Sequence, residues 1–338
     1  MQNKNQIGLN IADITILLSL PYSKEKFILK KDFLSFFVNP TSFNKPEVNI
    51  QIYYNKTPPI FHKKRSIVEA GSWLRAFSSS KRKKFLYMID AFQEKTLIKG
   101  IFKRRFEYKK ISFNLEILLN IDRFNLGIAK KLLPLPYRVA IFNGNFKTGY
   151  IYVKEKRDRA ILPFPLEPPF LEILLINLLV LSESGMILHS SGIVDDGKAY
   201  LFIGGPGAGK STMAELWRQA GGKMLQDEKI IVRKNKGSFL AFSIPGYGGT
   251  NLKPAFKGIK IEKIFFIYHS QKNEIKQLNS SGATYHLLRN GSGALFYLGI
   301  DSLDWYIRFC KELALRIPCY SLGFVPDRKV IDFIREIK

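Results

Sequence analysis

Cysteine is nearly absent from this chain of 338 residues, which contains only Cys310 and Cys319. Two thiols are too few for a disulfide framework, and their spacing is not that of a metal site. Buried thiols in a reducing compartment are the simplest interpretation. Histidine is also scarce, and His62, His269 and His286 are too scattered along the sequence to predict a metal site.

Long hydrophobic runs are missing as well. Residues 14–20 and 170–181 are apolar, but both stretches are shorter than the roughly 20 residues that a membrane-spanning helix needs. The second stretch contains Glu172 and Asn177, which favours a helix buried inside protein. Asp13 precedes the first stretch, and neither a basic region nor a small-residue cleavage site frames it, so no export signal is expected. These observations predict a cytoplasmic protein.

Acidic residues are the third scarcity, with 28 Asp and Glu against 53 Lys and Arg and a net charge of +25. Residues 1–160 hold 31 basic and 12 acidic residues, whereas residues 161–338 hold 22 and 16. Four basic clusters account for much of the excess: residues 63–65, 81–84, 103–105 and 154–159. Such a charge attracts an acidic peptide or protein, a nucleic acid or an anionic membrane. The alternative is a merely solvated surface, and no DNA- or RNA-recognition motif accompanies the clusters.

The first half of the sequence has the character of β-strands. Its strand-like segments alternate apolar with polar residues or are rich in aromatic and β-branched residues. These segments are residues 48–52, 96–102, 106–115 and 149–154. Four prolines between residues 162 and 169 then interrupt any strand or helix. We therefore expect two domains: a basic, β-rich, antiparallel domain at 1–162 and a second domain at 163–338.

Helices and buried strands alternate in the second half, which predicts an α/β (α+β) domain. The expected helices are residues 170–182, 211–219 and 302–317, and the expected buried strands are residues 199–203 and 261–268.

A phosphate-binding loop is the strongest motif in the chain. The sequence Gly204-Gly205-Pro206-Gly207-Ala208-Gly209-Lys210-Ser211 satisfies the pattern G-x-x-x-x-G-K-[ST], between an expected strand and an expected helix. Glycines let successive backbone N–H groups turn toward phosphate oxygens, and the helix N-terminus adds partial positive charge. Lys210 would neutralise the β- and γ-phosphates, and the hydroxyl of Ser211 would bind Mg²⁺. The predicted ATP-binding residues run from Gly204 through Thr212.

The residues around the loop narrow the class of nucleotide-binding protein. His189, in the segment Leu188-His189-Ser190-Ser191-Gly192, lies 21 residues before Lys210. The pair Asp227-Glu228 begins 17 residues after Lys210. This constellation resembles the C-terminal domain of HPr serine kinase/phosphorylases over roughly residues 165–335. Residues 243–250, rich in glycine with one proline, are similar to a loop of the same relatives.

The resemblance implies a P-loop kinase domain whose fold is related to phosphoenolpyruvate carboxykinase and which uses ATP and Mg²⁺. In that comparison Asp227 would be the general base that deprotonates an attacking serine hydroxyl. Glu228 would bind Mg²⁺ together with Ser211. His189 would lie beside the phosphates and help to position the transferred group. The first 160 residues carry no such resemblance.

The expected function is phosphorylation of a hydroxyl group, that of a serine in a peptide or protein. Two alternatives stay open: a kinase of small-molecule hydroxyls with the same site, and a nucleotide-gated protein whose basic half binds nucleic acid or membrane. A homo-oligomer is also open. The sequence offers Arg233, Lys253 and Arg289 as cations for the transition-state charge but does not choose between them.

Overall fold

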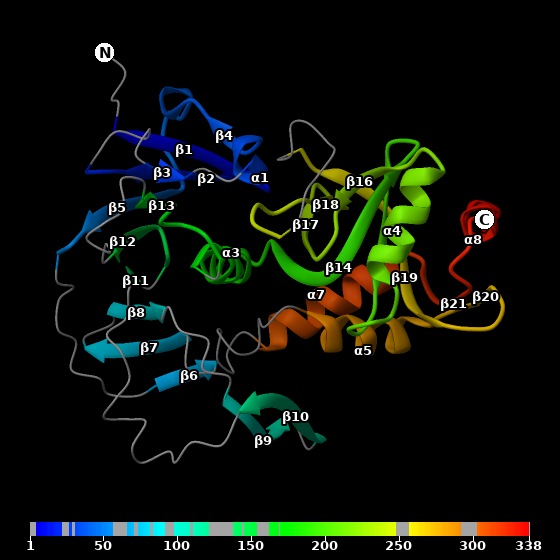
Figure 1. Cartoon of the computed structure of the whole chain (residues 1–338). Helices are drawn as coiled ribbons and strands as arrows, with labels where there is room; N and C mark the ends of the chain where they lie inside the picture. The colour runs from blue at the N-terminus through cyan, green and yellow to red at the C-terminus, as the bar shows by residue number, and fades with distance from the viewer. Residues whose placement is uncertain are drawn as a thin grey trace.

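The computed structural model of the chain (Figure 1) is a mixed α/β structure built around two large sheets. The structure describes residues 5–21, 27–28, 31–56, 66–70, 74–81, 84–91, 98–108, 111–121, 138–143, 145–153, 162–168, 170–247, 257–291 and 303–337. The side chains of the four basic clusters lie outside the part that it describes.

The expected β-rich first half forms a nine-stranded sheet in the order β4-β1-β2-β5-β12-β11-β8-β7-β6. Its strands are β1 (Gln6–Ile11), β2 (Ile14–Ser19), β4 (Phe37–Val38), β5 (Val48–Tyr54), β6 (Ser66–Ala70), β7 (Leu74–Lys81), β8 (Lys84–Ala91), β11 (Arg138–Phe142) and β12 (Thr148–Val153). In β5 every second side chain is buried, as the alternation in the sequence predicts.

Two predictions for this half were partly wrong. The sheet is not wholly antiparallel, because β5 pairs in parallel with both β2 and β12. Strand β5 enters the sheet only after a long connection, and the local sequence pattern carries no signal for such a pairing. The two strands expected at residues 96–102 and 106–115 are instead β9 (Ile98–Tyr108) and β10 (Ile111–Ile121), which pair as one long antiparallel hairpin.

Short elements complete the first half. They are β3 (Phe27–Ile28), the single-turn helix α1 (Lys31–Leu34), the 3₁₀ turn η2 (Pro40–Ser42) and β13 (Leu162–Pro163). The proline-rich segment thus contributes only a two-residue parallel pairing of β13 with β3, which agrees with the interruption that its prolines predict.

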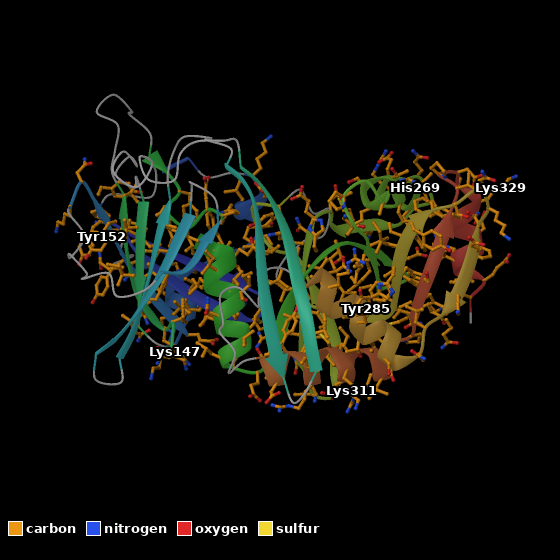
Figure 2. The ribbon with its side chains drawn as sticks, turned by 90° about the horizontal axis from the view of Figure 1, so that it is seen from below. Lys147, Tyr152, His269, Tyr285, Lys311 and Lys329 are labelled. Atoms are coloured by element: carbon orange, nitrogen blue, oxygen red, sulfur yellow. The ribbon has the colours of Figure 1, made fainter. Side chains whose placement is uncertain are left out.

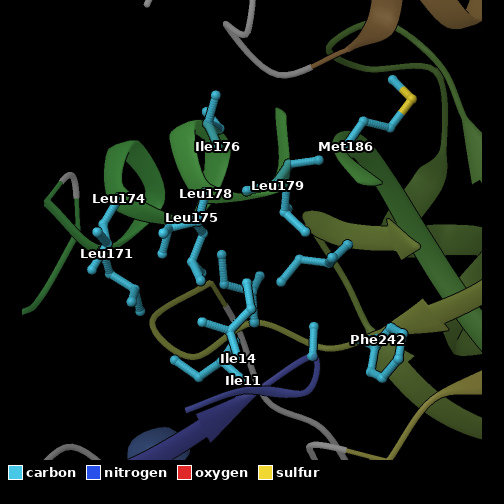
Figure 3. Close-up of a cluster of buried hydrophobic side chains, with 14 of the residues drawn as sticks. Ile11, Ile14, Leu171, Leu174, Leu175, Ile176, Leu178, Leu179, Met186 and Phe242 are labelled. Carbon is cyan, nitrogen blue, oxygen red and sulfur yellow. The ribbon is translucent and has the colours of Figure 1, made fainter. Parts of the chain in front are cut away.

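Helix α3 (Phe170–Leu181) connects the two sheets. Ten of its twelve residues are buried, around the whole circumference of the helix. A helix that is apolar on every side has to be enclosed, and α3 packs in one continuous cluster with β1, β2 and the second sheet. Figure 3 shows its leucines above Ile11 and Ile14, with Phe242 to the side in the same buried cluster. Whether the chain divides into independent domains at residue 162 stays a prediction.

The second sheet has eight strands: β14 (Gly185–Asp195), β15 (Lys198–Ile203), β16 (Lys223–Gln226), β17 (Lys229–Asn235), β18 (Ser238–Phe242), β19 (Ile259–His269), β20 (Glu274–Gln277) and β21 (Cys319–Phe324). Its helices are α4 (Lys210–Gln219), α5 (Ser280–Asn290), α7 (Leu303–Arg316) and α8 (Lys329–Arg335). The helices expected at 170–182, 211–219 and 302–317 and the strands expected at 199–203 and 261–268 are confirmed within two residues.

Long strand β14 gives this sheet its shape. Its first half pairs with β17 and its second half with β15. Because β18 pairs with β19 and β19 pairs with β15, the strand pairing closes on itself. In the part of the chain that the structure describes, no helix is both long enough and apolar enough to cross a membrane.

Candidate active site

The glycine-rich loop lies where three parallel strands end. Strands β15, β19 and β21 are neighbours and run in the same direction, and the loop follows β15 directly and leads into α4. Ligands of parallel sheets bind at the carboxyl ends of the strands. Helix α4 also begins there, so its first backbone N–H groups and its dipole face the loop. The fold thus provides an anion-binding position at residues 204–212.

Two glycines in this loop are required by its backbone. Gly207 has a φ of +78° and Gly209 has a φ of +93°, values that side chains other than glycine's adopt only with strain. A Cβ on Gly209 would also lie 2.7 Å from Cζ of Phe324, whereas nothing lies within 4 Å of a Cβ on Gly205. The curled loop therefore depends on glycine most strongly at position 209.

Lys210 folds back over the loop. Its Nζ donates hydrogen bonds to the carbonyl oxygens of Gly204, at 2.8 Å, and Gly205, at 3.1 Å. Burial lowers the pKa of the Lys210 ammonium, while the carboxylates of Asp227 and Glu228 act in the opposite direction. The Lys210 ammonium is therefore held over the loop by the carbonyl oxygens of Gly204 and Gly205, and it is attracted by the carboxylates of Asp227 and Glu228.

The acidic pair lies in the bend between β16 and β17. Ser211 Oγ donates a hydrogen bond to Asp227 Oδ2 at 3.1 Å, which ties the bend to the first turn of α4. The other oxygen, Asp227 Oδ1, is buried and has no hydrogen-bond partner among the described residues. The side chain of Glu228 is exposed, and its backbone oxygen accepts a hydrogen bond from the N–H of Ser190 at 3.1 Å.

His189 completes the group from β14, where it stands opposite Lys229 of β17. Its ring is half-buried, and burial is the first cause that lowers its pKa, followed by the charges of Lys210 and Lys229. Glu228 and Glu172 act against that shift. Histidine with a lowered pKa is neutral at pH 7, so this ring has one N–H donor and one acceptor nitrogen.

The sequence-predicted residues His189, Lys210, Ser211, Asp227 and Glu228 are therefore brought together from β14, the phosphate loop, α4 and the β16–β17 bend. The exposed Thr212 side chain follows Ser211 in the first turn of α4. The segments that carry these site residues are far apart in the sequence and meet only in the fold.

These residues fit a nucleotide with Mg²⁺. The oxygen donors of Ser211, Asp227 and Glu228 are of the hard kind that Mg²⁺ prefers, and the unpartnered Asp227 Oδ1 is the kind of buried polar atom that a ligand satisfies. The described residues contain no cluster of three or more His, Cys, Asp or Glu side chains. Kinase sites need none, because phosphate oxygens and water provide most Mg²⁺ ligands.

The sequence analysis missed His269. This residue ends β19, and its Nε2 lies 2.6 Å from the carbonyl oxygen of Gly207 in the phosphate loop. Its ring also stacks on Phe324, with 6.2 Å between the ring centroids. Figure 2 shows His269 at the end of the molecule opposite Lys147 and Tyr152 of the first sheet. A signal was available, because the buried strand expected at residues 261–268 ends immediately before it.

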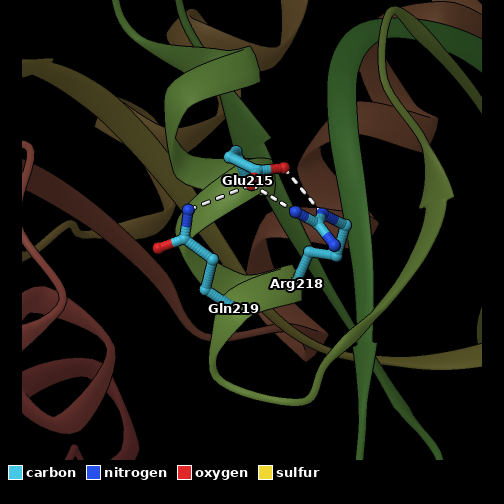
Figure 4. A network of polar contacts seen from close by, with 3 residues as sticks. All are labelled: Glu215, Arg218 and Gln219. Atoms are coloured by element: carbon cyan, nitrogen blue, oxygen red, sulfur yellow. Dashed lines mark hydrogen bonds and ion pairs between the residues drawn. The ribbon is translucent and has the colours of Figure 1, made fainter.

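Two arginines of the second sheet and its helices, Arg218 and Arg233, have partners of their own. Arg218 on the outer face of α4 donates two hydrogen bonds to Glu215, at 2.7 and 2.6 Å, and Gln219 donates a third (Figure 4). This pairing lowers the pKa of Glu215 to about 2. Arg233 donates to the backbone oxygen of Ala12 and so joins the two sheets. Lys253 lies outside the described residues, and Arg289 is in the last turn of α5.

The solved structures that resemble this chain include a distantly similar kinase. The HPr(Ser) kinase/phosphatase from Coxiella burnetii aligns with 10% sequence identity and a TM-score of 0.28, over 44% of this chain and 93% of that chain. No family model and no curated protein matches the chain. A likeness at this level says nothing about the chemistry of the site.

Proposed function

We propose that this chain is an ATP- and Mg²⁺-dependent kinase that transfers the γ-phosphoryl group to a hydroxyl, that of a serine in a peptide or protein. The observation that carries the proposal is the contact of Asp227 with the phosphate-loop helix. One carboxylate oxygen of Asp227 accepts from Ser211, and the other is buried without a partner among the described residues. A phosphate loop with a carboxylate beside it has both parts that phosphoryl transfer needs.

The loop and Lys210 bind the nucleotide phosphates in this proposal. Backbone N–H groups of the loop and of the first turn of α4 donate to phosphate oxygens, and the ammonium of Lys210 exchanges its carbonyl partners for phosphate. Ser211 and Glu228 provide oxygen ligands for Mg²⁺. Mg²⁺ held there would neutralise part of the charge on the nucleotide phosphates.

Asp227 performs the proton transfer. The carboxylate of Asp227 accepts the proton of the acceptor hydroxyl as the oxygen of that hydroxyl forms a bond to the γ-phosphorus. The bond from the γ-phosphorus to the β,γ-bridging oxygen breaks, and ADP leaves with the bonding electrons. Neutral His189, whose pKa is lowered by burial and by the charges of Lys210 and Lys229, uses its N–H to orient the transferred group.

The acceptor class follows from charge and from the resemblance of the motif set to serine kinases. The basic excess of residues 1–160 suits an acidic peptide or protein. Its binding should weaken steeply between low and physiological salt, where charges are screened over about 8–10 Å. Substitution of the basic residues at 81–84 and 103–105 should have the same effect. If neither salt nor these substitutions changes the affinity for the acceptor, the basic residues serve only to solvate the surface.

The experiment is incubation of the purified chain with γ-labelled ATP and Mg²⁺ in the presence of acidic serine peptides or small hydroxyl metabolites. Mass spectrometry then identifies the phosphorylated products, with Asp227→Asn as the inactive control. Phosphoserine formed only by the unmodified chain supports the proposal. Labelled metabolites alone would favour a small-molecule kinase. ATP binding without any transfer, together with salt-sensitive binding of nucleic acid or vesicles, would favour a nucleotide-gated binding protein.

A further inference from the structure

One residue contacts both neighbours of the acidic pair. The side-chain amide of Gln226, which precedes Asp227, donates to the backbone oxygen of Tyr247. The ammonium of Lys229, which follows Glu228, lies 4.4 Å from the centroid of the Tyr247 ring. Gln226 is buried, with 1% of its surface exposed, so its amide has a strong need for a partner. Both ends of the bend thus contact one residue, Tyr247, through its backbone oxygen and its ring.

Glu172 of α3 binds both Lys229 and Tyr247 and so stabilises the contact between them. Its Oε1 accepts from Lys229 Nζ at 2.5 Å, and its Oε2 accepts from the hydroxyl of Tyr247. Only 12% of the Glu172 side chain and 18% of the Lys229 side chain are exposed. When a buried ion pair loses one partner, an uncompensated charge remains, so these three groups hold one another in place.

The loop that carries Tyr247 is itself anchored. The N–H of Gly246 donates to Asp32 Oδ2 of α1 at 3.2 Å. Gly246 has a φ of +91°, and a Cβ there would lie 2.7 Å from Cγ of Pro168. The loop therefore packs directly on the proline-rich segment, which leaves Tyr247 little freedom to move away from the acidic pair.

We propose that Tyr247 is a positioning residue that sets the place of Asp227 and Glu228 relative to the phosphate loop. This inference rests on the proposed function and adds to it a residue that touches neither nucleotide nor acceptor. Asp227 and Glu228 form a bend of two residues, so the position of both depends on Gln226 and Lys229 at its ends. Misplacement of a reacting group by about 1 Å can cost roughly 10²-fold in rate.

The test uses four variants of the full chain. Tyr247→Ala removes the ring and the hydroxyl, while Tyr247→Phe keeps the ring over Lys229 and removes the hydroxyl that donates to Glu172. Gln226→Met removes the amide donor at similar size. The matched control is Tyr268→Phe. This variant removes the same kind of tyrosine–glutamate hydrogen bond, at 3.2 Å, between Tyr268 of β19 and Glu274 of β20. Backbone hydrogen exchange across residues 223–231, ATP affinity and single-turnover transfer are measured for each.

Tyr247→Ala and Gln226→Met should raise exchange at residues 223–231 about tenfold or more and lower transfer roughly 10- to 100-fold. ATP affinity should stay within about twofold, because the loop and Lys210 are intact. Tyr247→Phe should recover most of the transfer, and Tyr268→Phe should match the unmodified chain. Unchanged exchange and transfer in Tyr247→Ala and Gln226→Met would overturn the inference, as would an exchange increase spread evenly over the whole chain. If the unmodified chain binds no ATP, the proposed function fails, whereas the exchange data still decide whether Tyr247 positions the bend.

Discussion

The hydroxyl of Ser211 lies 3.1 Å from Oδ2 of Asp227, across 16 residues of sequence. This contact joins the first turn of the phosphate-loop helix to the bend that carries the acidic pair. The second carboxylate oxygen, Asp227 Oδ1, is buried and has no hydrogen-bond partner among the described residues.

Lys210→Ala should weaken ATP binding by roughly 10- to 100-fold, because a hydrogen bond to a charged group contributes about 1.5–3 kcal/mol. Calorimetric titration with ATP measures the effect. The control is Lys198→Ala, which removes an equal charge from an exposed ion pair between β15 and Glu262 of β19, and the ATP affinity of this variant should stay normal. Full ATP affinity in a folded Lys210→Ala chain would show that the loop binds no phosphate.

Gly209→Ala should destabilise the fold by about 1–3 kcal/mol, since the new Cβ combines a positive φ with overlap against Phe324. Denaturant unfolding of the two variants Gly209→Ala and Gly205→Ala provides the measurement. Gly205 has open space around it and no positive φ, so its variant should unfold like the unmodified chain. Equal stability of both variants would mean that the loop is not held against Phe324.

His189 should titrate below the ordinary histidine value of 6.5, because burial and the charges of Lys210 and Lys229 lower its pKa. The unfolded chain then binds this proton more tightly than the folded chain. The contribution of His189 to the free energy of unfolding is therefore complete above pH 6.5 and is lost as the pH falls toward the folded pKa.

Proton NMR of the His189 ring measures the midpoint directly. Lys229→Met removes one of the lowering charges and should move the midpoint upward, while Lys198→Met should leave it unchanged. A titration midpoint of the His189 ring at or above pH 6.5 in the unmodified chain would contradict the lowering of its pKa by burial and by the two lysines.

Most elements of the second half were predictable because their signals are local. Each signal is contained in a few consecutive residues. Examples are the apolar strand that ends at Ile203, the glycines after it and the amphipathic helix that follows. The closed strand pairing and the parallel insertion of β5 depend on contacts between distant segments. The periodicity of a single sequence does not indicate which distant strands pair.

The same limit applies to the site. Lys210, Asp227 and His189 could be named from their spacing, whereas the contact of Tyr247 with Glu172 spans 75 residues. His269 reaches Gly207 across 62 residues. Both contacts form only when distant segments of the chain pack together. His269 belongs to no motif, and the pattern of residues 243–250 does not indicate that Tyr247 contacts Glu172.

The central claim is that Asp227 is the catalytic base of a kinase, and Asp227→Asn tests it most directly. The amide keeps the size of the side chain and can accept from Ser211, but it cannot take the proton of the acceptor. ATP·Mg²⁺ affinity and single-turnover transfer are measured on the same preparation, with slow ATP hydrolysis as the readout until an acceptor is known. Transfer should fall roughly 10²- to 10⁴-fold, about 3–5 kcal/mol of barrier, and nucleotide affinity should change much less. Full transfer by Asp227→Asn would contradict this claim and place the base elsewhere.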